Sequence, residues 1–137
     1  MLTTLTVKTS INAPIQKVWA CFTQPNHVMQ WNHASDDWHS PAATNDLQVG
    51  GKFVYTMAAK DGSFSFDFSG TYTEVLNEEL LIYKIDDGRE VKVTFASIGD
   101  ITEVVEIFEP ENENPLEMQQ AGWQAILDSF KGYVKEN

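Results

Sequence analysis

The sequence predicts an α+β fold in which a curved antiparallel sheet closes around one long C-terminal helix. Between residues 50 and 108, apolar and polar residues alternate in a series of short segments, which is typical of half-buried strands. Tight-turn sequences separate these segments, so consecutive strands are expected to pair antiparallel. Residues 115–135 carry apolar side chains at helical spacing, and a helix of that length extends roughly 30 Å.

The chain opens with a strand and a helix. Residues 5–11 alternate apolar and polar side chains, which predicts a strand with one buried face. Asn12 and Pro14 then favour a helix start, with the asparagine as its cap and the proline in its first turn. From Ile15, apolar residues follow at i, i+3, i+4 and i+7, which predicts one apolar helical stripe.

A less regular region follows this helix. We expect a second short helix over residues 27–31, and an irregular segment over residues 32–46 with room for one short strand. The segment from Trp31 to His39 holds two tryptophans, two histidines and two aspartates. It is interpreted either as a polar loop at the rim of a pocket or as a segment that contacts a ligand.

The middle of the chain predicts a meander of five or six strands. Its clearest period-two segment places Phe64, Phe66, Phe68 and Tyr72 on one face. Gly70 interrupts this segment, as glycine does where a strand bends or bulges. Turn sequences divide the meander at four places: Asp61-Gly62, Asn77–Glu79, Asp86–Arg89 and Ile98–Asp100.

The C-terminal helix is expected to cover the aromatic face of the sheet. Asn114 and Pro115 predict its start, with the asparagine as cap and the proline at the first helical position. Gln119 and Gln120 lie one helical turn before Trp123, which belongs to the apolar stripe of this helix. That stripe contains Leu116, Trp123, Ile126, Leu127, Phe130, Tyr133 and Val134. Together these elements predict a single domain over residues 1–137, with six to seven strands and one or two short helices after the first strand.

Composition narrows the classes of partner. The net charge is −11, from 20 acidic and 9 basic residues, and it disfavours nucleic acid and anionic membrane surfaces. The lone cysteine, Cys21, cannot form an internal disulfide. The N-terminus lacks the pattern of a signal peptide, and no apolar run reaches the ~20 residues of a membrane span. We therefore expect a cytoplasmic protein.

Four stretches of the chain resemble a known family. They are residues 11–19, 49–62, 68–75 and 112–127. In them the chain resembles the helix-grip proteins of the START-like (SRPBC) superfamily and, more narrowly, the activator of heat-shock protein 90 ATPase homologue family. The resemblance implies a cavity between the sheet and the long helix. Many relatives bind an apolar small molecule there, such as a lipid, sterol or polyketide.

The aromatic face allows two interpretations, a filled core or a ligand cavity. Buried aromatic rings contribute most of the apolar area in either case, while tyrosine hydroxyls need hydrogen-bond partners and can orient a polar group. The residues predicted to line such a cavity are Trp31, His33, Trp38, Phe53, Tyr55, Met57, Phe66, Phe68, Tyr72, Tyr83, Phe95, Gln119, Trp123 and Ile126.

Neither a metal nor a cofactor is predicted. His33 and His39 are six residues apart in an expected loop, which matches no metal-ligand spacing. Glu74, Glu103 and Glu106 fall in predicted strands, where strand-end carboxylates are usually solvated. Alternation places Glu74 on the aromatic face, although it lies near a strand end.

Three functions are consistent with these patterns. The favoured hypothesis is a binding module that carries a small apolar molecule in the cavity, as a monomer or homodimer. The second is a cyclase- or dehydratase-type enzyme, for which the acid or base candidates are Tyr55, Tyr72, Glu74 and His33. The third is an interaction module that acts on the chaperone heat-shock protein 90, as the family resemblance implies.

Overall fold

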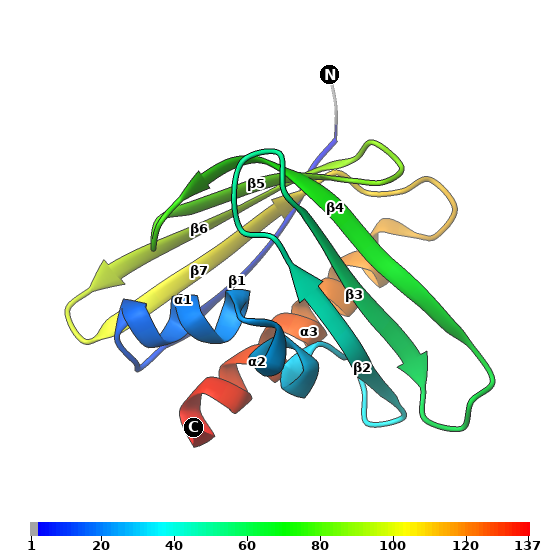
Figure 1. Ribbon diagram of the computed structural model, residues 1–137, viewed down its shortest axis with the longest axis horizontal. Helices are drawn as coiled ribbons and strands as arrows, with labels where there is room; N and C mark the ends of the chain where they lie inside the picture. Colours follow the sequence, from blue (N-terminus) through cyan, green and yellow to red (C-terminus); the bar gives the residue numbers. More distant parts are fainter. Residues whose placement is uncertain (1–2) are drawn as a thin grey trace.

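The computed structural model describes residues 3–137 and confirms the predicted α+β class (Figure 1). One antiparallel sheet curls over three helices, which all lie on its concave side. The elements, in chain order, are β1 (Leu5–Ile11), α1 (Ile15–Thr23), α2 (Pro25–Trp31), β2 (Trp38–Asn45), β3 (Lys52–Ala59), β4 (Ser65–Leu76), β5 (Leu80–Ile85), β6 (Glu90–Ile98), β7 (Ile101–Phe108) and α3 (Leu116–Glu136).

The seven strands form one antiparallel sheet, and the twist of its strands makes the sheet curl. Neighbouring strands run β1-β7-β6-β5-β4-β3-β2, and every pairing is antiparallel. The chain crosses from one edge strand, β1, to the other, β2, by way of α1 and α2. It then returns strand by strand until β7 pairs with β1. Seven twisted strands cannot stay flat, and their concave face encloses α3 (Figure 1).

Both predicted asparagine caps are wrong. Pro14 and Pro115 occupy the cap positions of α1 and α3, and neither helix has a side-chain capping hydrogen bond. The Asn114 amide nitrogen instead donates to the Glu111 carboxylate at 3.0 Å, within the loop before α3. Proline fits the cap position because its missing backbone N–H breaks no helical hydrogen bond there. Its fixed φ also suits the extended backbone before a helix.

Two irregularities shape β4. A Cβ on Gly70 would lie 2.7 Å from the Lys84 carbonyl oxygen and 2.9 Å from the Phe53 ring, so only glycine allows that ring to cross the strand. Beyond Tyr72 the register with β5 shifts by one residue. This bulge reverses the alternation, and Glu74 pairs with the outward-facing Ile82. The expectation that Glu74 shares the aromatic face is therefore wrong.

Helix α3 is also joined to the edge strand β1 by side-chain amides. The Gln124 Nε2 donates to the Lys8 carbonyl at 3.1 Å, and the Lys8 backbone N–H donates to the Gln124 Oε1 at 3.3 Å. The Gln120 Nε2 donates to the Thr6 carbonyl at 3.0 Å. These glutamines satisfy strand backbone groups that have no neighbouring strand.

The core fills the space between the sheet and the second half of α3. Phe130 is fully buried, and its ring centre lies 5.3 Å from that of Phe22 and 4.8 Å from that of Trp31. Leu127 and Val134 are buried on the same side of the helix. Within residues 3–137, no helix combines the length and apolarity that a membrane crossing requires.

Candidate functional site

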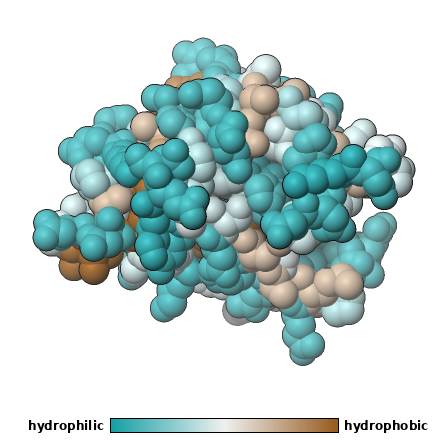
Figure 2. Space-filling model, turned by 90° about the horizontal axis from the view of Figure 1, so that it is seen from below, coloured by the Kyte–Doolittle hydropathy of each residue, from teal (hydrophilic) through white to brown (hydrophobic). Residues whose placement is uncertain are grey.

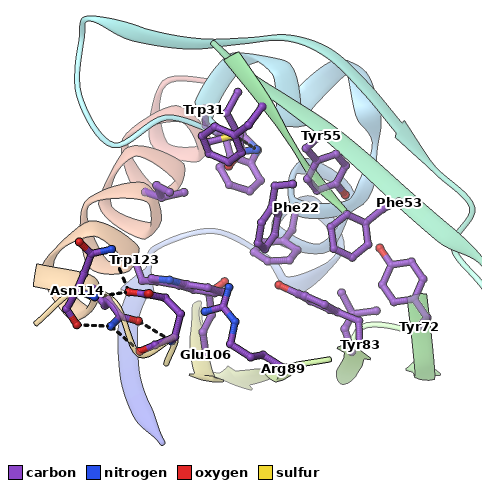
Figure 3. Close-up of a pocket in the computed structure, with 18 residues that line it drawn as sticks. Phe22, Trp31, Phe53, Tyr55, Tyr72, Tyr83, Arg89, Glu106, Asn114 and Trp123 are labelled. Atoms are coloured by element: carbon purple, nitrogen blue, oxygen red, sulfur yellow. Dashed lines mark hydrogen bonds between the residues drawn. The ribbon is translucent and has the colours of Figure 1, made fainter. Parts of the chain in front are cut away.

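A cavity of about 320 Å³ lies between the concave face of the sheet and the first half of α3 (Figure 3). The cavity adjoins the hydrophobic core, but core side chains do not fill it. The residues that line it are Phe22, Trp31, Asn32, Phe53, Tyr55, Met57, Phe66, Phe68, Tyr72, Leu81, Tyr83, Arg89, Glu106, Glu111, Asn114, Gln119, Trp123 and Ile126.

Aromatic rings form most of the wall. Phe53, only 1 % exposed, is the centre of one cluster, with ring centres 4.9 Å from Tyr55 and 4.8 Å from Tyr83. On the opposite side, Trp123 stacks flat on Phe108 with ring centres 4.0 Å apart. Packing among the rings fixes their positions, so the cavity has rigid walls.

Three tyrosine hydroxyls reach the interior from neighbouring strands. The Tyr72 hydroxyl donates to the Asn45 side-chain oxygen at 2.7 Å, and burial raises the pKa of Tyr72 to about 12. Burial also raises the pKa of Tyr55 and of Tyr83 well above the ordinary value of 10. All three side chains are therefore neutral hydrogen-bonding groups at physiological pH.

Glu106 is the one carboxyl group on the inner face of β7 among the described residues. Its strand neighbours, Val7 and Val93, are both fully buried. Burial raises the pKa of Glu106 from 4.5 to about 8, because the apolar surroundings disfavour the charged form. At pH 7 this side chain is mostly a neutral carboxylic acid.

The mouth of the cavity is polar and is built by the loop before α3. The Gln119 amide nitrogen donates to the carbonyls of Glu111 at 3.0 Å and Asn114 at 2.8 Å, while its oxygen accepts from the Glu111 backbone N–H at 2.9 Å. Gln119 therefore holds this acidic loop in place. Arg89 lines the same rim, and its guanidinium donates to the Asp87 carboxylate at 2.8 Å.

The far end of the cavity is closed by the end of α2. The Trp31 indole N–H donates to the Cys21 carbonyl at 2.8 Å, and the Ser129 hydroxyl donates to the Trp31 carbonyl at 2.8 Å. The Asn32 amide lies 3.1 Å from the sulfur of Met57. These bonds tie α1, α2 and α3 together and leave the mouth as the polar entrance.

Comparison with known proteins identifies the family. The family model described as "Activator of Hsp90 ATPase homolog 1-like protein" matches residues 12–135. The chain belongs to this family. The predicted family resemblance and helix-grip fold are thus confirmed. A search of functionally curated proteins found no match.

Solved structures agree with this assignment. The solution structure of an AHSA1-like protein from Aeromonas hydrophila is 46 % identical, with a TM-score of 0.93, over 98 % of this chain and 93 % of that one. A solution structure of Chr148 from Cytophaga hutchinsonii is 54 % identical, with a TM-score of 0.83, over 96 % and 92 % of the two chains. CalU16 from Micromonospora echinospora is 21 % identical, with a TM-score of 0.70, over 96 % and 75 %, and shares the fold alone.

Three of the residues predicted to line the cavity of this Hsp90-activator-like fold lie elsewhere. Phe95 packs edge-on between Trp19 and Phe22 in the core, with ring centres 5.0 and 5.3 Å away. Trp38 lies on the edge strand β2, next to the partly exposed Phe66. His33 lies in the loop after α2. All the other predicted lining residues border the cavity.

The structure brings only two of the four acid–base candidates of the enzyme hypothesis to the cavity. Glu74 is turned to the outer face, and His33 is outside the cavity, where burial and the nearby Lys60 lower its pKa. Tyr55 and Tyr72 do face the interior. Among the described residues, no group of three or more histidine, cysteine or carboxylate side chains is arranged to hold a metal ion.

Several lining residues of this family member were not predicted. Glu106 lies on a strand whose sequence is apolar on both faces, so alternation did not indicate its direction. Arg89, Glu111 and Asn114 come from loops, where no periodicity exists. The buried or half-buried Phe22, Asn32 and Leu81 come from positions that were assigned to the core, to a loop and to a strand.

Proposed function

We propose that this protein binds a small, largely apolar molecule in the cavity between the sheet and α3. The observation that carries the proposal is the cavity itself. About 320 Å³ of space remains inside a domain whose other half is closely packed, and aromatic residues line it. Small-molecule sites are typically concave and apolar with a few convergent polar groups, and this volume lies at the lower end of their range.

The partial burial of the cavity wall favours a ligand site over a packing defect of the core. Phe22, Tyr55, Trp123 and Ile126 are each only partly buried by the protein, although they lie beside fully buried residues. An apolar molecule that covers them would gain about 25 cal/mol for each Å² removed from water. The fixed aromatic walls would lose little freedom on binding, which favours affinity.

Charge favours a neutral ligand over a fatty-acid anion. The net charge is −11, Glu111 lies at the entrance, and Arg89, which lines the cavity, is paired with the Asp87 carboxylate. The face of the molecule in Figure 2 is mostly hydrophilic, with its apolar side chains in small separate areas. An anionic headgroup would therefore approach a negative surface and lose its hydration at a site that offers it few positive charges.

Titration of the ¹⁵N-labelled protein with a fatty acid, a sterol, a polyphenol and a neutral aromatic compound tests the proposal. We expect the neutral compounds to shift the amide signals of Tyr55, Tyr83 and Trp123, and to remain bound in native mass spectra. If no compound of the panel shifts any cavity residue, the proposal is wrong.

A matched pair of variants sharpens the test. Ile126→Trp adds an indole where the cavity lies, whereas Ala121→Trp adds the same group on the exposed side of the same helix. We expect Ile126→Trp to weaken binding at least about tenfold, because the ring occupies the ligand's space. Ala121→Trp is expected to leave affinity unchanged. Equal affinities in the two variants would place the binding elsewhere.

A further inference from the structure

Two polar side chains, Tyr83 and Glu106, extend into the cavity from the sheet (Figure 3). Tyr83 on β5 pairs with Val91 of β6, and Glu106 on β7 pairs with Val93, which lies two residues further along β6. Two strand spacings and a two-residue offset put their backbones roughly 12 Å apart, and both long side chains extend over the concave face between these positions. The electrostatic effect of Glu106 on the pKa of Tyr83 agrees with this proximity.

Neither side chain has its hydrogen bonds satisfied by the protein. Among the described residues, no hydrogen bond and no charged neighbour affects the pKa of Glu106, which responds to burial alone. Tyr83 likewise has no hydrogen-bond contribution to its pKa, in contrast to Tyr72, which donates to Asn45. Among the described residues, no fully buried side-chain nitrogen or oxygen lacks a hydrogen-bond partner. The unpartnered oxygens of Tyr83 and Glu106 are therefore not fully buried, and they are accessible from the cavity that both residues line.

The charge state of this pair is set by its surroundings. At pH 7 the Glu106 carboxyl is mostly protonated and the Tyr83 hydroxyl is neutral, so each offers an O–H donor. An apolar site that holds a carboxylic acid neutral makes it a strong hydrogen-bond donor. The titratable groups that share the cavity with Glu106 are Tyr55, Tyr72, Tyr83, Arg89 and Glu111.

We propose that Tyr83 and Glu106 form a subsite that holds the carbonyl oxygen of an otherwise apolar aromatic ligand. A carbonyl oxygen has two lone pairs and can accept from both O–H groups at once. The aromatic walls around Phe53 and Trp123 suit the remaining ring surface. A cationic ligand would instead require Glu106 to ionise, and an anion would meet its carboxyl while the cavity's arginine, Arg89, is already paired with Asp87. This inference rests on the proposed function and names its ligand class.

Three naphthalene probes of similar shape test the subsite. 2-Acetylnaphthalene presents a carbonyl oxygen, 2-isopropenylnaphthalene replaces that oxygen with a CH₂ group, and trimethyl(2-naphthyl)ammonium carries a permanent positive charge. We expect the ketone to bind about tenfold or more tightly than the alkene at pH 7, since an unmet hydrogen bond on either side is costly. Equal binding of ketone and alkene would overturn the subsite while leaving the proposed function in place.

Variants of the pair identify the donors. We expect Glu106→Leu and Tyr83→Phe each to remove most of the ketone's advantage over the alkene. Glu106→Gln keeps an N–H donor and should retain part of the advantage. Glu103→Gln, on the same strand but outside the cavity lining, is the matched control and should change nothing. If the ketone still binds more tightly than the alkene by the full wild-type ratio in all three variants, Tyr83→Phe, Glu106→Gln and Glu106→Leu, the assignment of the two donors is wrong.

pH and infrared spectra separate this role from general packing. The carbonyl stretch of bound 2-acetylnaphthalene should lie at lower frequency than in an apolar solvent, and it should return toward that value in Glu106→Leu. Its affinity should fall as the pH rises through about 8 in the wild type and stay level in Glu106→Gln. An affinity that rises with pH, or tighter binding of the ammonium probe, would show that Glu106 binds a cation and would overturn the proposal.

The two proposals can fail separately. If none of the three probes binds but another compound of the panel does, the carbonyl subsite is rejected and the cavity remains a binding site. If nothing binds, both proposals fall. A ¹⁵N correlation spectrum of each variant confirms that it is folded before its affinity is compared.

Discussion

The two halves of α3 carry one apolar stripe but face different interiors. In the second half, Leu127, Phe130 and Val134 are buried among side chains that fill the space beneath them. In the first half, Trp123 and Ile126 are only partly buried and border a cavity of about 320 Å³. A filled core and an open cavity, which the sequence left as alternatives, both occur along the same helix.

The difference arises from what lies opposite each half. The short helices α1 and α2 supply Phe22 and Trp31, which both pack edge-to-face with Phe130, and the three ring centres are 4.8–5.5 Å apart. The cavity beside Trp123 and Ile126 is bordered mainly by residues of the curved sheet, with Phe22 and Trp31 also lining it. A stripe of apolar residues therefore predicts which face of a helix is covered, but not whether the space it faces is filled.

The largest expected effect concerns the filled half. Phe130→Ala removes a fully buried ring that contacts Phe22 and Trp31, so it should lower the free energy of unfolding by about 3–5 kcal/mol. Urea denaturation measures this loss. A cost below about 1 kcal/mol would mean that the second half of α3 is as loosely packed as the first.

The next effect concerns the carboxyl group inside the cavity. Glu106 titrates near 8 when folded and near 4.5 when unfolded, so the folded state holds the proton more tightly. The stability that the neutral Glu106 carboxyl contributes is fully present below the unfolded-state pKa of 4.5. It is lost as the pH rises through the folded-state pKa of about 8, which lowers the free energy of unfolding by a few kcal/mol. Compared with wild type, Glu106→Gln should lose less stability between pH 5 and 9, measured by denaturation at each pH. Parallel curves would show that Glu106 is solvated.

A smaller effect is expected where Phe53 crosses β4. Gly70→Ala places a methyl group against the Phe53 ring and the Lys84 carbonyl, which should cost about 1–3 kcal/mol and push the ring toward the cavity. Gly122→Ala on α3 is the control, because its Cβ meets nothing within 4 Å, and it should be neutral or stabilising. Thermal denaturation measures the stability of both variants. Equal stabilities would contradict the predicted clash at Gly70.

The smallest effect is expected for Ile126→Ala on α3, and the neighbouring Leu127→Ala provides the comparison. Ile126→Ala enlarges a space that already exists, so it should cost about 1 kcal/mol, mainly from lost apolar burial. Leu127→Ala empties a filled position, at 1 % exposure, and should cost about 2–5 kcal/mol. The two variants should unfold at different urea concentrations. Equal midpoints would contradict the division of the helix into a packed half and a cavity half.

Periodicity made the fold readable from the sequence. The clear alternation from Phe64 to Tyr72 and the helical stripe of α3 depend on local backbone geometry, so they predict strands, a helix and the faces that meet. The family resemblance supplied the order in which these faces close around each other. The short strand expected after α2 is a full strand, β2, whose register shifts between His39 and Ala42 and so weakens its alternation.

The polar part of the site was not readable in the same way. The bulge after Tyr72 turns Glu74 outward, while Glu106, on a strand with apolar residues on both faces, points inward. A one-residue shift in register reverses a side chain, and nothing in the local sequence measures that shift. Gln119 was predicted, but its role in holding the acidic loop depends on contacts with Glu111 and Asn114 that only the folded loop creates.

The amide bonds from Gln120 and Gln124 to β1 have a consequence for self-association. An open sheet edge invites another chain to add a strand and begin aggregation. Here α3 occupies that edge, and on the opposite edge Pro41 and the irregular register of β2 disrupt regular strand addition. Both glutamines belong to the half of α3 that borders the cavity. Any movement that lifts this half of α3 would therefore break these bonds and expose the backbone edge of β1.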